Sequence, residues 1–299
     1  MKVLIAGGTG LIGKKIISLL SQKGFEINLL SRKKVMIPGV NSFIWNPENM
    51  EIDPAAFKDV DSVINLSGAG IAEERWTEKR KNIILESRIK AVDTLKKGII
   101  DSDNKPKSFI GASATGYYGG SYTENIYSET DSPANDFLGN TCKKWEESYV
   151  EIEKLGIRTC VVRIGIVLSR EGGAYPKMRA PVALGLGSAL GSGKQWMPWV
   201  HIDDVTGIFH HLVLTEGIDG AFNAVADECI NNSGFMKRIA QKLRKPFFLP
   251  AVPGFLLKTM LGEMAIIVLG SSRVGNQKIK KSGYTFNYPD LDSALDNLA

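Results

Sequence analysis

Residues 3–20 read VLIAGGTGLIGKKIISLL, an apolar run that ends in glycines and then changes its pattern. Residues 3–6 are apolar and unalternated, which predicts a strand buried inside a parallel sheet. Beyond the glycines, apolar residues recur with the period of a helix. They are Leu11, Ile12, Ile16, Leu19 and Leu20. The stretch therefore predicts a strand, a glycine turn and a helix in direct succession.

The glycines of this turn are spaced G-x-x-G-x-x-G. A helix N-terminus offers free N–H groups and a positive dipole end, and glycine lets the backbone approach an anion. We expect the pyrophosphate of a dinucleotide here, on the following residues: Gly7, Thr9, Gly10, Leu11, Ile12 and Gly13. The alternative is a tight strand–helix turn that binds no ligand.

The next expected strand, residues 27–30, is followed by Ser31, Arg32 and Lys33. NAD-binding proteins usually place an acidic residue here to hold the ribose 2′-hydroxyl, whereas cations favour a 2′-phosphate. We therefore predict NADP(H) as the cofactor, with these three residues at its 2′-phosphate. The alternative is a basic loop that only contacts solvent.

Strand-like and helix-like segments continue to alternate, which predicts an α/β fold with a doubly wound parallel Rossmann sheet. The expected strands are residues 43–45, 60–65, 109–113 and 159–163, and the expected helices are residues 77–95, 233–243, 254–261 and 290–298. Ligands of such sheets lie at the carboxyl ends of the strands. The cofactor is therefore also expected at Asn65, Leu66, Ser67 and Gly68.

The regular alternation stops after residue 168, where a segment rich in Gly and Pro begins. We expect residues 1–168 to form the NADP-binding Rossmann domain, with part of the later chain returning to it. Residues 169–299 are expected to form mainly a smaller C-terminal substrate lobe.

The overall charge of +5 is spread along the chain, which favours a small anionic substrate over nucleic acid. Cys142, Cys160 and Cys229 form no Cys-x-x-Cys pair and are expected to be free thiols. The sequence shows no cluster with metal-ligand spacing, so no metal is expected. It also shows no apolar run long enough for a membrane span, which favours a cytoplasmic protein. The oligomeric state is left open.

Several motifs give the chain a family resemblance: RWTEKRKNIILESRI (75–89), SATGYYG (113–119), RIGIVLSREGGAYPKM (163–178) and LGSGKQWMPWVHIDD (190–204). With the glycine turn, they resemble the extended short-chain dehydrogenase/reductase superfamily. Within it, they are similar to the sugar-nucleotide epimerase-like family, also labelled cell-division inhibitor-like. The resemblance covers the whole chain. It implies an NADP-binding Rossmann protein that acts as an oxidoreductase or epimerase on a small or nucleotide-linked sugar-like substrate.

The chain departs from this superfamily at the catalytic helix. Extended members carry a Ser and then Tyr-x-x-x-Lys, in which the Tyr moves a proton and the Lys lowers the pKa of the Tyr and holds the nicotinamide ribose. Ser113 matches the Ser, but Leu138 stands at the Tyr position and Cys142 at the Lys position. Both residues share one helical face with Trp145, so we interpret them as core packing.

Three residues remain as candidates for proton transfer, namely Ser113, Tyr117 and Tyr118. The alternative for Tyr118 is wall packing. Arg88 stands where relatives often place an active-site Asn, and its charge could hold an anionic substrate or a cofactor phosphate. The alternative for Arg88 is a surface salt bridge. We include Arg88 and Ser113 among the expected cofactor contacts.

A further departure concerns the substrate, because Met197 stands where nucleotide-sugar enzymes place a diphosphate-binding Arg. Lys194, Arg179 or Arg273 are possible replacements. His201 and Asp203 are expected to orient their loop. Two functions stay open: an atypical NADP-dependent oxidoreductase or epimerase, and a catalytically weak NADP-binding regulator of cell division or the envelope.

Overall fold

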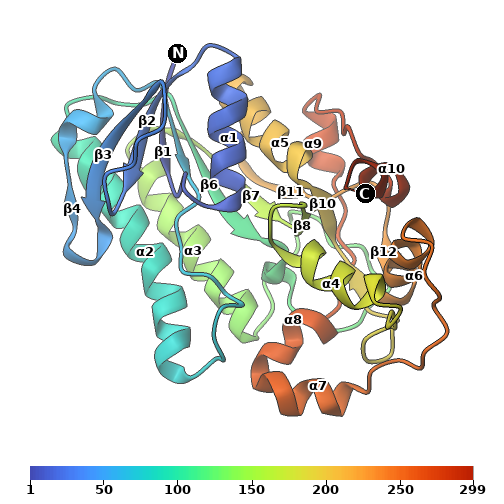
Figure 1. The fold of residues 1–299 in the computed structure, drawn as a ribbon. Helices are drawn as coiled ribbons and strands as arrows, with labels where there is room; N and C mark the ends of the chain where they lie inside the picture. Colours follow the sequence, from blue (N-terminus) through green and yellow to red (C-terminus); the bar gives the residue numbers. More distant parts are fainter. Residues whose placement is uncertain (299) are drawn as a thin grey trace.

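A central sheet of eight strands organises the computed structural model, which describes residues 1–298 (Figure 1). The strands lie in the order β11-β7-β6-β5-β1-β2-β3-β4. Their neighbours pair in parallel, except for the antiparallel pair of β3 and β4 at one edge. Their bounds are β1 Lys2–Ala6, β2 Glu26–Ser31, β3 Val40–Asn46, β4 Glu51–Ile52, β5 Ser62–Asn65, β6 Ser108–Ala114, β7 Arg158–Ile164 and β11 Gly220–Ala224. The expected α/β class with a parallel Rossmann sheet is confirmed.

Two pairs of helices cover this sheet. Helix α1 (Leu11–Gln22) packs against α5 (Ile202–Leu214), and α2 (Glu78–Asp101) packs against α3 (Phe137–Glu153). Val3, Leu4 and Ile5 of β1 are fully buried in succession. Because successive strand residues point to opposite faces, both faces of the sheet are covered. This explains why the opening strand has no polar alternation.

The later chain adds short elements beside the sheet. β8 (Ile166–Leu168) pairs in parallel with β10 (Trp199–His201), and β9 (Trp196–Met197) pairs antiparallel with β12 (Ile230–Asn231). The remaining helices are α4 Ala174–Ala183, α6 Asn232–Lys242, α7 Gly254–Leu261, α8 Ile266–Leu269, α9 Gln277–Lys281 and α10 Leu291–Leu298. Short 3₁₀ helices span η1 Pro47–Asn49, η2 Pro54–Phe57, η3 Thr115–Tyr118 and η4 Gly262–Ala265.

The hydrophobic core has two main clusters. The larger one surrounds the central sheet and includes residues of α5 and β11, although both follow residue 168. The second contains Trp199, Phe235 and Leu295 and belongs to the later elements. A division of the chain at residue 168 stays a prediction.

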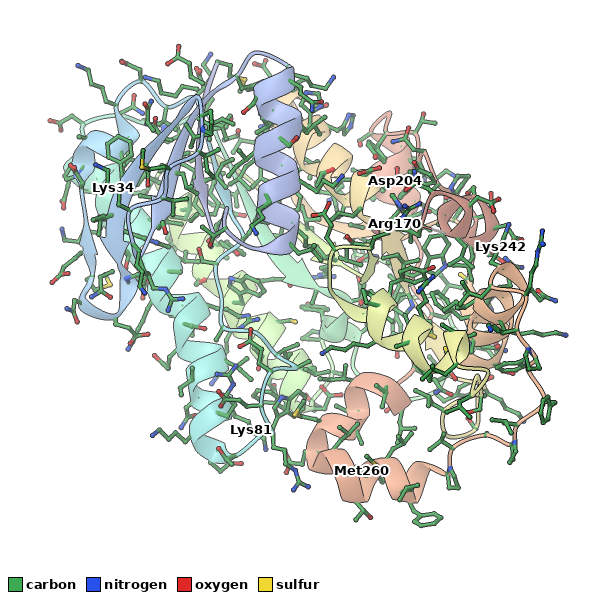
Figure 2. All side chains as sticks on the ribbon, in the orientation of Figure 1. Lys34, Lys81, Arg170, Asp204, Lys242 and Met260 are labelled. Atoms are coloured by element: carbon green, nitrogen blue, oxygen red, sulfur yellow. The ribbon has the colours of Figure 1, made fainter. Side chains whose placement is uncertain are left out.

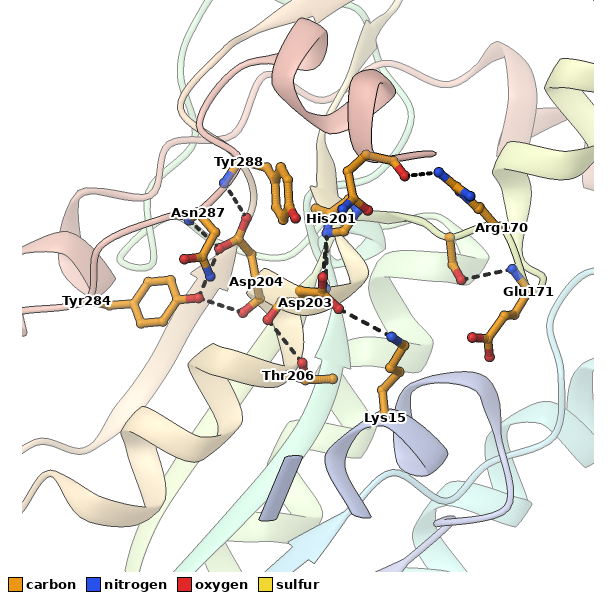
Figure 3. Close-up of polar contacts among 12 residues, drawn as sticks. Lys15, Arg170, Glu171, His201, Asp203, Asp204, Thr206, Tyr284, Asn287 and Tyr288 are labelled. Carbon is orange, nitrogen blue, oxygen red and sulfur yellow. Dashed lines mark hydrogen bonds and ion pairs between the residues drawn. The ribbon is translucent and has the colours of Figure 1, made fainter. Parts of the chain in front are cut away.

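Asp204 ties the C-terminal segment to the first turn of α5 (Figure 3). Its side chain is fully buried and accepts hydrogen bonds from the Tyr284 hydroxyl and from the backbone N–H groups of Asn287 and Tyr288, at 2.7–3.0 Å. Burial raises the pKa of this carboxyl group, although these hydrogen bonds oppose the shift. Asp204 therefore holds the segment before α10 against the main sheet.

Helix α7 lies at the edge of the molecule, where Met260 projects outward (Figure 2). No residue of α7 is buried within the described chain, and Phe255 is 73% exposed. The neighbouring segment is attached to the start of α2, because Lys81 pairs with Glu263 and Arg75 Nη2 donates to the Thr259 carbonyl at 3.2 Å.

Candidate functional site

The turn between β1 and α1 consists of Gly7, Gly8, Thr9 and Gly10, so only Thr9 has a side chain there. Gly7 has φ +80°, and a Cβ there would lie 2.7 Å from the Leu66 carbonyl carbon. A Cβ on Gly13 would lie 2.5 Å from the Gly7 carbonyl oxygen. Thr9 and Gly10 are exposed, while Leu11 and Ile12 are partly buried. The backbone is therefore closely packed behind the turn and accessible in front of it.

The N-terminus of α1 has no side-chain cap, unlike those of several neighbouring helices. Gly10 is the N-cap residue and carries no polar side chain, whereas Thr77 caps α2 and Asp136 caps α3. The first turn of α1 also has no acidic residue. Its free N–H groups and helix dipole suit an anion, so this end of the sheet fits the phosphates of a dinucleotide.

The basic loop after β2 is open to solvent. Arg32 and Lys33 are exposed, and neither forms an ion pair with any of the residues 1–298. Ser31 is partly buried, and its hydroxyl accepts a hydrogen bond from the Lys33 N–H at 3.4 Å. Two cations without counter-charges at the carboxyl end of β2 fit a 2′-phosphate.

The loop at residues 65–68 lies between the glycine turn and α2. Asn65 is fully buried, and its amide oxygen accepts from the Ser67 N–H at 3.0 Å. This side chain therefore shapes the loop from inside, and contact of Asn65 with the cofactor stays a prediction. Leu66 and Ser67 are partly buried and Gly68 is exposed, so these residues can line a ligand.

Arg88 on α2 points at this loop. Its Nη1 donates to the carbonyl oxygens of Ala69 and Ile84, at 3.1 and 2.6 Å. A Cβ on Gly68 would lie 3.0 Å from the Arg88 guanidinium carbon. The alternative of a surface salt bridge is wrong, since the structure of residues 1–298 shows no carboxylate in ion-pair contact with Arg88. Burial lowers the pKa of Arg88.

The candidates for proton transfer differ in exposure. The Ser113 hydroxyl is buried and donates to Glu146 Oε1 at 2.6 Å. Tyr118 is 2% exposed, donates to Asn223 Oδ1 at 2.7 Å and accepts from Arg163 Nη1 at 2.9 Å. Burial raises the pKa of Tyr118 to about 12. These contacts support the wall-packing alternative for Tyr118, and its role in proton transfer stays a prediction.

Tyr117 keeps a partly exposed side chain beside this network. The Arg163 guanidinium lies 3.5 Å from its ring centroid, and Tyr118 packs edge-on at 5.4 Å. Burial raises the pKa of Tyr117, and the positive charge of Arg163 opposes the shift. Among the three candidates, Tyr117 is the phenol that a substrate could approach.

The catalytic-helix positions carry no replacement for Tyr and Lys. Cys142 is 5% exposed and packs on the same helix face as Trp145 and Tyr149. Burial raises the pKa of the Cys142 thiol to about 11, so the thiol is neutral at physiological pH. Leu138 is partly buried and packs over Gly116. A Cβ on Gly116 would lie 3.3 Å from the Cβ of Leu138. These contacts support the interpretation as packing.

A buried ion pair that the sequence did not reveal lies behind Tyr117. Arg163 at the end of β7 donates to both carboxylate oxygens of Glu146 on α3, at 2.9 and 2.8 Å. Their side chains are 4% and 14% exposed. Burial opposes the charge of Arg163, but the hydrogen bonds to Glu146 outweigh it and raise its pKa. The one sign of this pair in the sequence is a charged residue, Arg163, at the end of a predicted strand. Its partner Glu146 lies 17 positions earlier, and no residue spacing pointed to it.

On the substrate side, Met197 is buried among apolar residues. Of its suggested replacements, Lys194 is exposed and Arg273 stacks on Trp196 at 4.6 Å. Arg273 also lies 3.7 Å from the Glu124 carboxylate. The His201 Nδ1 accepts from the Asp203 N–H at 3.2 Å and so caps α5, which fits the expected orienting role (Figure 3).

The comparisons with known proteins agree with this geometry. Residues 3–224 match the NAD dependent epimerase/dehydratase family, and residues 252–298 match a domain of unknown function (DUF1731). The chain belongs to the NAD dependent epimerase/dehydratase family. The resemblance stated from the motifs is confirmed.

Three proteins illustrate the relationship. Epimerase family protein YfhF of Bacillus subtilis is 35% identical over 300 residues, covering 100% of this chain and 98% of the relative. The crystal structure of human epimerase family protein SDR39U1 (isoform 2) with NADPH has TM-score 0.88 and 32% identity, covering 100% of this chain and 99% of that one. UDP-glucose 4-epimerase from Thermotoga maritima, with UDP-glucose, has TM-score 0.78 but 19% identity over 99% and 96% of the chains, and shows the fold alone.

Residues 1–298 hold neither a candidate metal centre nor a candidate membrane span. No group of three or more His, Cys, Asp or Glu side chains could hold a metal ion. No helix in that range is long and apolar enough to cross a membrane.

Proposed function

We propose that this protein binds NADP(H) and uses it in an atypical oxidoreductase or epimerase reaction on a small anionic or nucleotide-linked sugar-like substrate. The uncapped N-terminus of α1 supports the pyrophosphate site, and the unpaired Arg32 and Lys33 support the 2′-phosphate site. NADPH in the human relative's crystal structure supports the same cofactor. The free thiols of the chain suit a reducing compartment such as the cytoplasm.

The observation that carries the chemical proposal is the position of Tyr117. Bound NADPH would supply a hydride. Tyr117 is the partly exposed phenol beside the buried Arg163–Glu146 pair, and we assign it the proton that a carbonyl oxygen needs when hydride adds to its carbon. Ser113 positions Glu146 from inside the wall.

The raised pKa of Tyr117 gives the reaction a preferred direction. At neutral pH the phenol is protonated, so it can donate a proton during reduction but cannot accept one during oxidation. The rate of reduction should therefore stay constant from neutral pH up to the pKa of Tyr117, which lies above the ordinary tyrosine value of about 10. Oxidation of an alcohol with NADP⁺ should be slow at neutral pH and rise toward that pKa.

The test is NADPH consumption by the purified protein with a panel of aldehydes, ketones and nucleotide sugars. Tyr117→Phe should lower kcat by about 100-fold or more, since general acid catalysis contributes on that order. Tyr122→Phe is the matched control, because Tyr122 is exposed and donates to Glu124, outside the Arg163–Glu146 network. Equal rates in wild type and Tyr117→Phe would reject the assignment.

A second function is favoured by the closed network around Ser113. Its hydroxyl is bound to Glu146, and Leu138 and Cys142 offer no proton carrier. An NADP-binding regulator of cell division or the envelope would need a cofactor site but no proton carrier. Tight NADPH binding together with no turnover across the panel would favour the regulator over the enzyme.

A further inference from the structure

Arg88 is a partly buried cation whose remaining donors have no protein partner. Two backbone carbonyls, of Ala69 and Ile84, accept hydrogen bonds from its Nη1. Its Nε and Nη2 donate to no atom of residues 1–298, and no carboxylate pairs with it there. Burial disfavours the charged form of Arg88, and an anionic ligand at these open donors would stabilise it.

The location of the guanidinium is set by three elements. The guanidinium contacts Gly68. Leu66, on the same loop, lies against the glycine turn, because a Cβ on Gly7 would be 2.7 Å from the Leu66 carbonyl carbon. The guanidinium therefore lies near the glycine turn. On its other side it lies 4.8 Å from the ring centroid of Trp145, three residues after Cys142 on α3. Arg88 thus brings charge from α2 toward the position where the superfamily pattern would place a lysine on α3.

Two further polar atoms around Arg88 have no partner. The Ser67 hydroxyl, next to Gly68, and the Trp145 Nε1, in the ring under the guanidinium, are buried without a hydrogen bond to any described residue. Buried polar groups are normally paired. Together with the open Nε and Nη2 of Arg88, this hydroxyl and this indole N–H favour an acceptor-rich group, such as a phosphate with its ribose.

We propose that Arg88 binds the nicotinamide-side ribose and phosphate of NADP(H), and supplies from α2 the positive charge that is missing at position 142. This inference rests on the proposed binding of NADP(H). It goes further by assigning Arg88 to one half of the cofactor, whereas Arg32 and Lys33 serve the adenosine half.

The test compares two ligands. Adenosine 2′,5′-bisphosphate keeps the half assigned to Arg32 and lacks the nicotinamide half. Arg88→Met preserves the aliphatic stem over Trp145 and removes the charge. Calorimetric titration should show NADPH binding weakened about 10-fold or more, as expected for lost charged hydrogen bonds, with bisphosphate binding within about twofold of wild type.

Two variants sharpen the result. Lys97→Met, on the same helix, is the matched control because the Lys97 side chain is 46% exposed and pairs with Asp101 at 2.6 Å. It should leave both affinities within about twofold of wild type. Arg88→Lys keeps the charge and should recover most of the NADPH affinity that Arg88→Met loses.

The outcomes separate the inference from the proposed function. Unchanged NADPH affinity in Arg88→Met overturns the inference, and so does an equal loss of both ligands. Failure of Arg88→Lys to bind NADPH more tightly than Arg88→Met overturns the role of charge. Wild-type protein that binds neither ligand overturns the cofactor proposal itself, a result that none of the variant comparisons can mimic.

Discussion

The carboxyl edge of the central sheet is built in opposite ways at the β1 and β2 end and at the β6 and β7 end. At the β1 and β2 end, polar groups are left open: α1 lacks a side-chain cap, and Arg32 and Lys33 have no carboxylate partner among the described residues. At the β6 and β7 end, Ser113 and Tyr118 are bound into the network of Glu146 and Arg163.

The difference separates binding from chemistry. Unpaired hydrogen-bond donors at a surface are solvated by water, so they reduce stability little, and they can bind an anion. A closed network has its hydrogen bonds already satisfied, so it contributes to the rigidity of the wall and leaves little for a substrate. Mutations at the closed end should therefore change stability, and mutations at the open end should change affinity.

The largest effect is expected at the buried ion pair. Glu146→Gln removes the charge that compensates Arg163 and should cost about 3–5 kcal/mol of unfolding free energy, measured by urea denaturation. Glu147→Gln is the control, because Glu147 is 60% exposed and lies 3.9 Å from Lys143; it should cost less than about 0.5 kcal/mol. Similar stability of the two variants would contradict a closed wall.

The glycine turn should show the opposite behaviour. Gly10→Val places a branched side chain at an exposed position whose nearest atom would be 3.4 Å away, so the melting temperature should change little. NADPH affinity should fall about 100-fold, or about 2.7 kcal/mol, because the side chain takes the space of the phosphates. Gly13→Val should instead destabilise the fold, since its Cβ would lie 2.5 Å from backbone atoms. Normal NADPH binding by Gly10→Val would remove this turn from the cofactor site.

The basic loop should set cofactor choice. Arg32→Asp should weaken NADPH binding by well over 10-fold, about 2 kcal/mol, because a charge-assisted hydrogen bond becomes a repulsion. NADH affinity should not fall, and calorimetric titration with both cofactors measures the difference. Lys34→Asp makes the same charge change one position beyond the proposed contacts and should have a smaller effect. Equal wild-type affinities for NADPH and NADH would contradict the 2′-phosphate site.

The smallest effect is expected at Cys142. Cys142→Ala should reduce unfolding free energy by about 1 kcal/mol through lost packing. It should leave NADPH binding and any turnover unchanged, because a buried thiol with a pKa of about 11 is a poor nucleophile. Turnover that is robust in wild type and absent in Cys142→Ala would make Cys142 catalytic.

Local features of the sequence predicted the fold and the open donors at the β1 and β2 end of the sheet. The expected strand at residues 3–6, the glycine turn and the following helix are contiguous, and the structure has β1 and α1 there. Arg32 and Lys33 follow Ser31, the last residue of β2, so their exposure could be inferred from their place at a strand end. The pattern could not show which side chains near the strand ends are enclosed, so the burial of Asn65 and Tyr118 could not be inferred from it.

The sequence by itself determined the parallel α/β sheet, the glycine turn, the basic loop and the absence of Tyr-x-x-x-Lys, because each depends on residues close together in the chain. Only the tertiary structure decided that Glu146 pairs with Arg163, that Arg88 from α2 reaches toward Cys142 on α3, and that Asp204 holds the C-terminal segment. These contacts join residues from separate elements. Their energies depend on burial and on the distance between charges, and both exist only once the elements have packed.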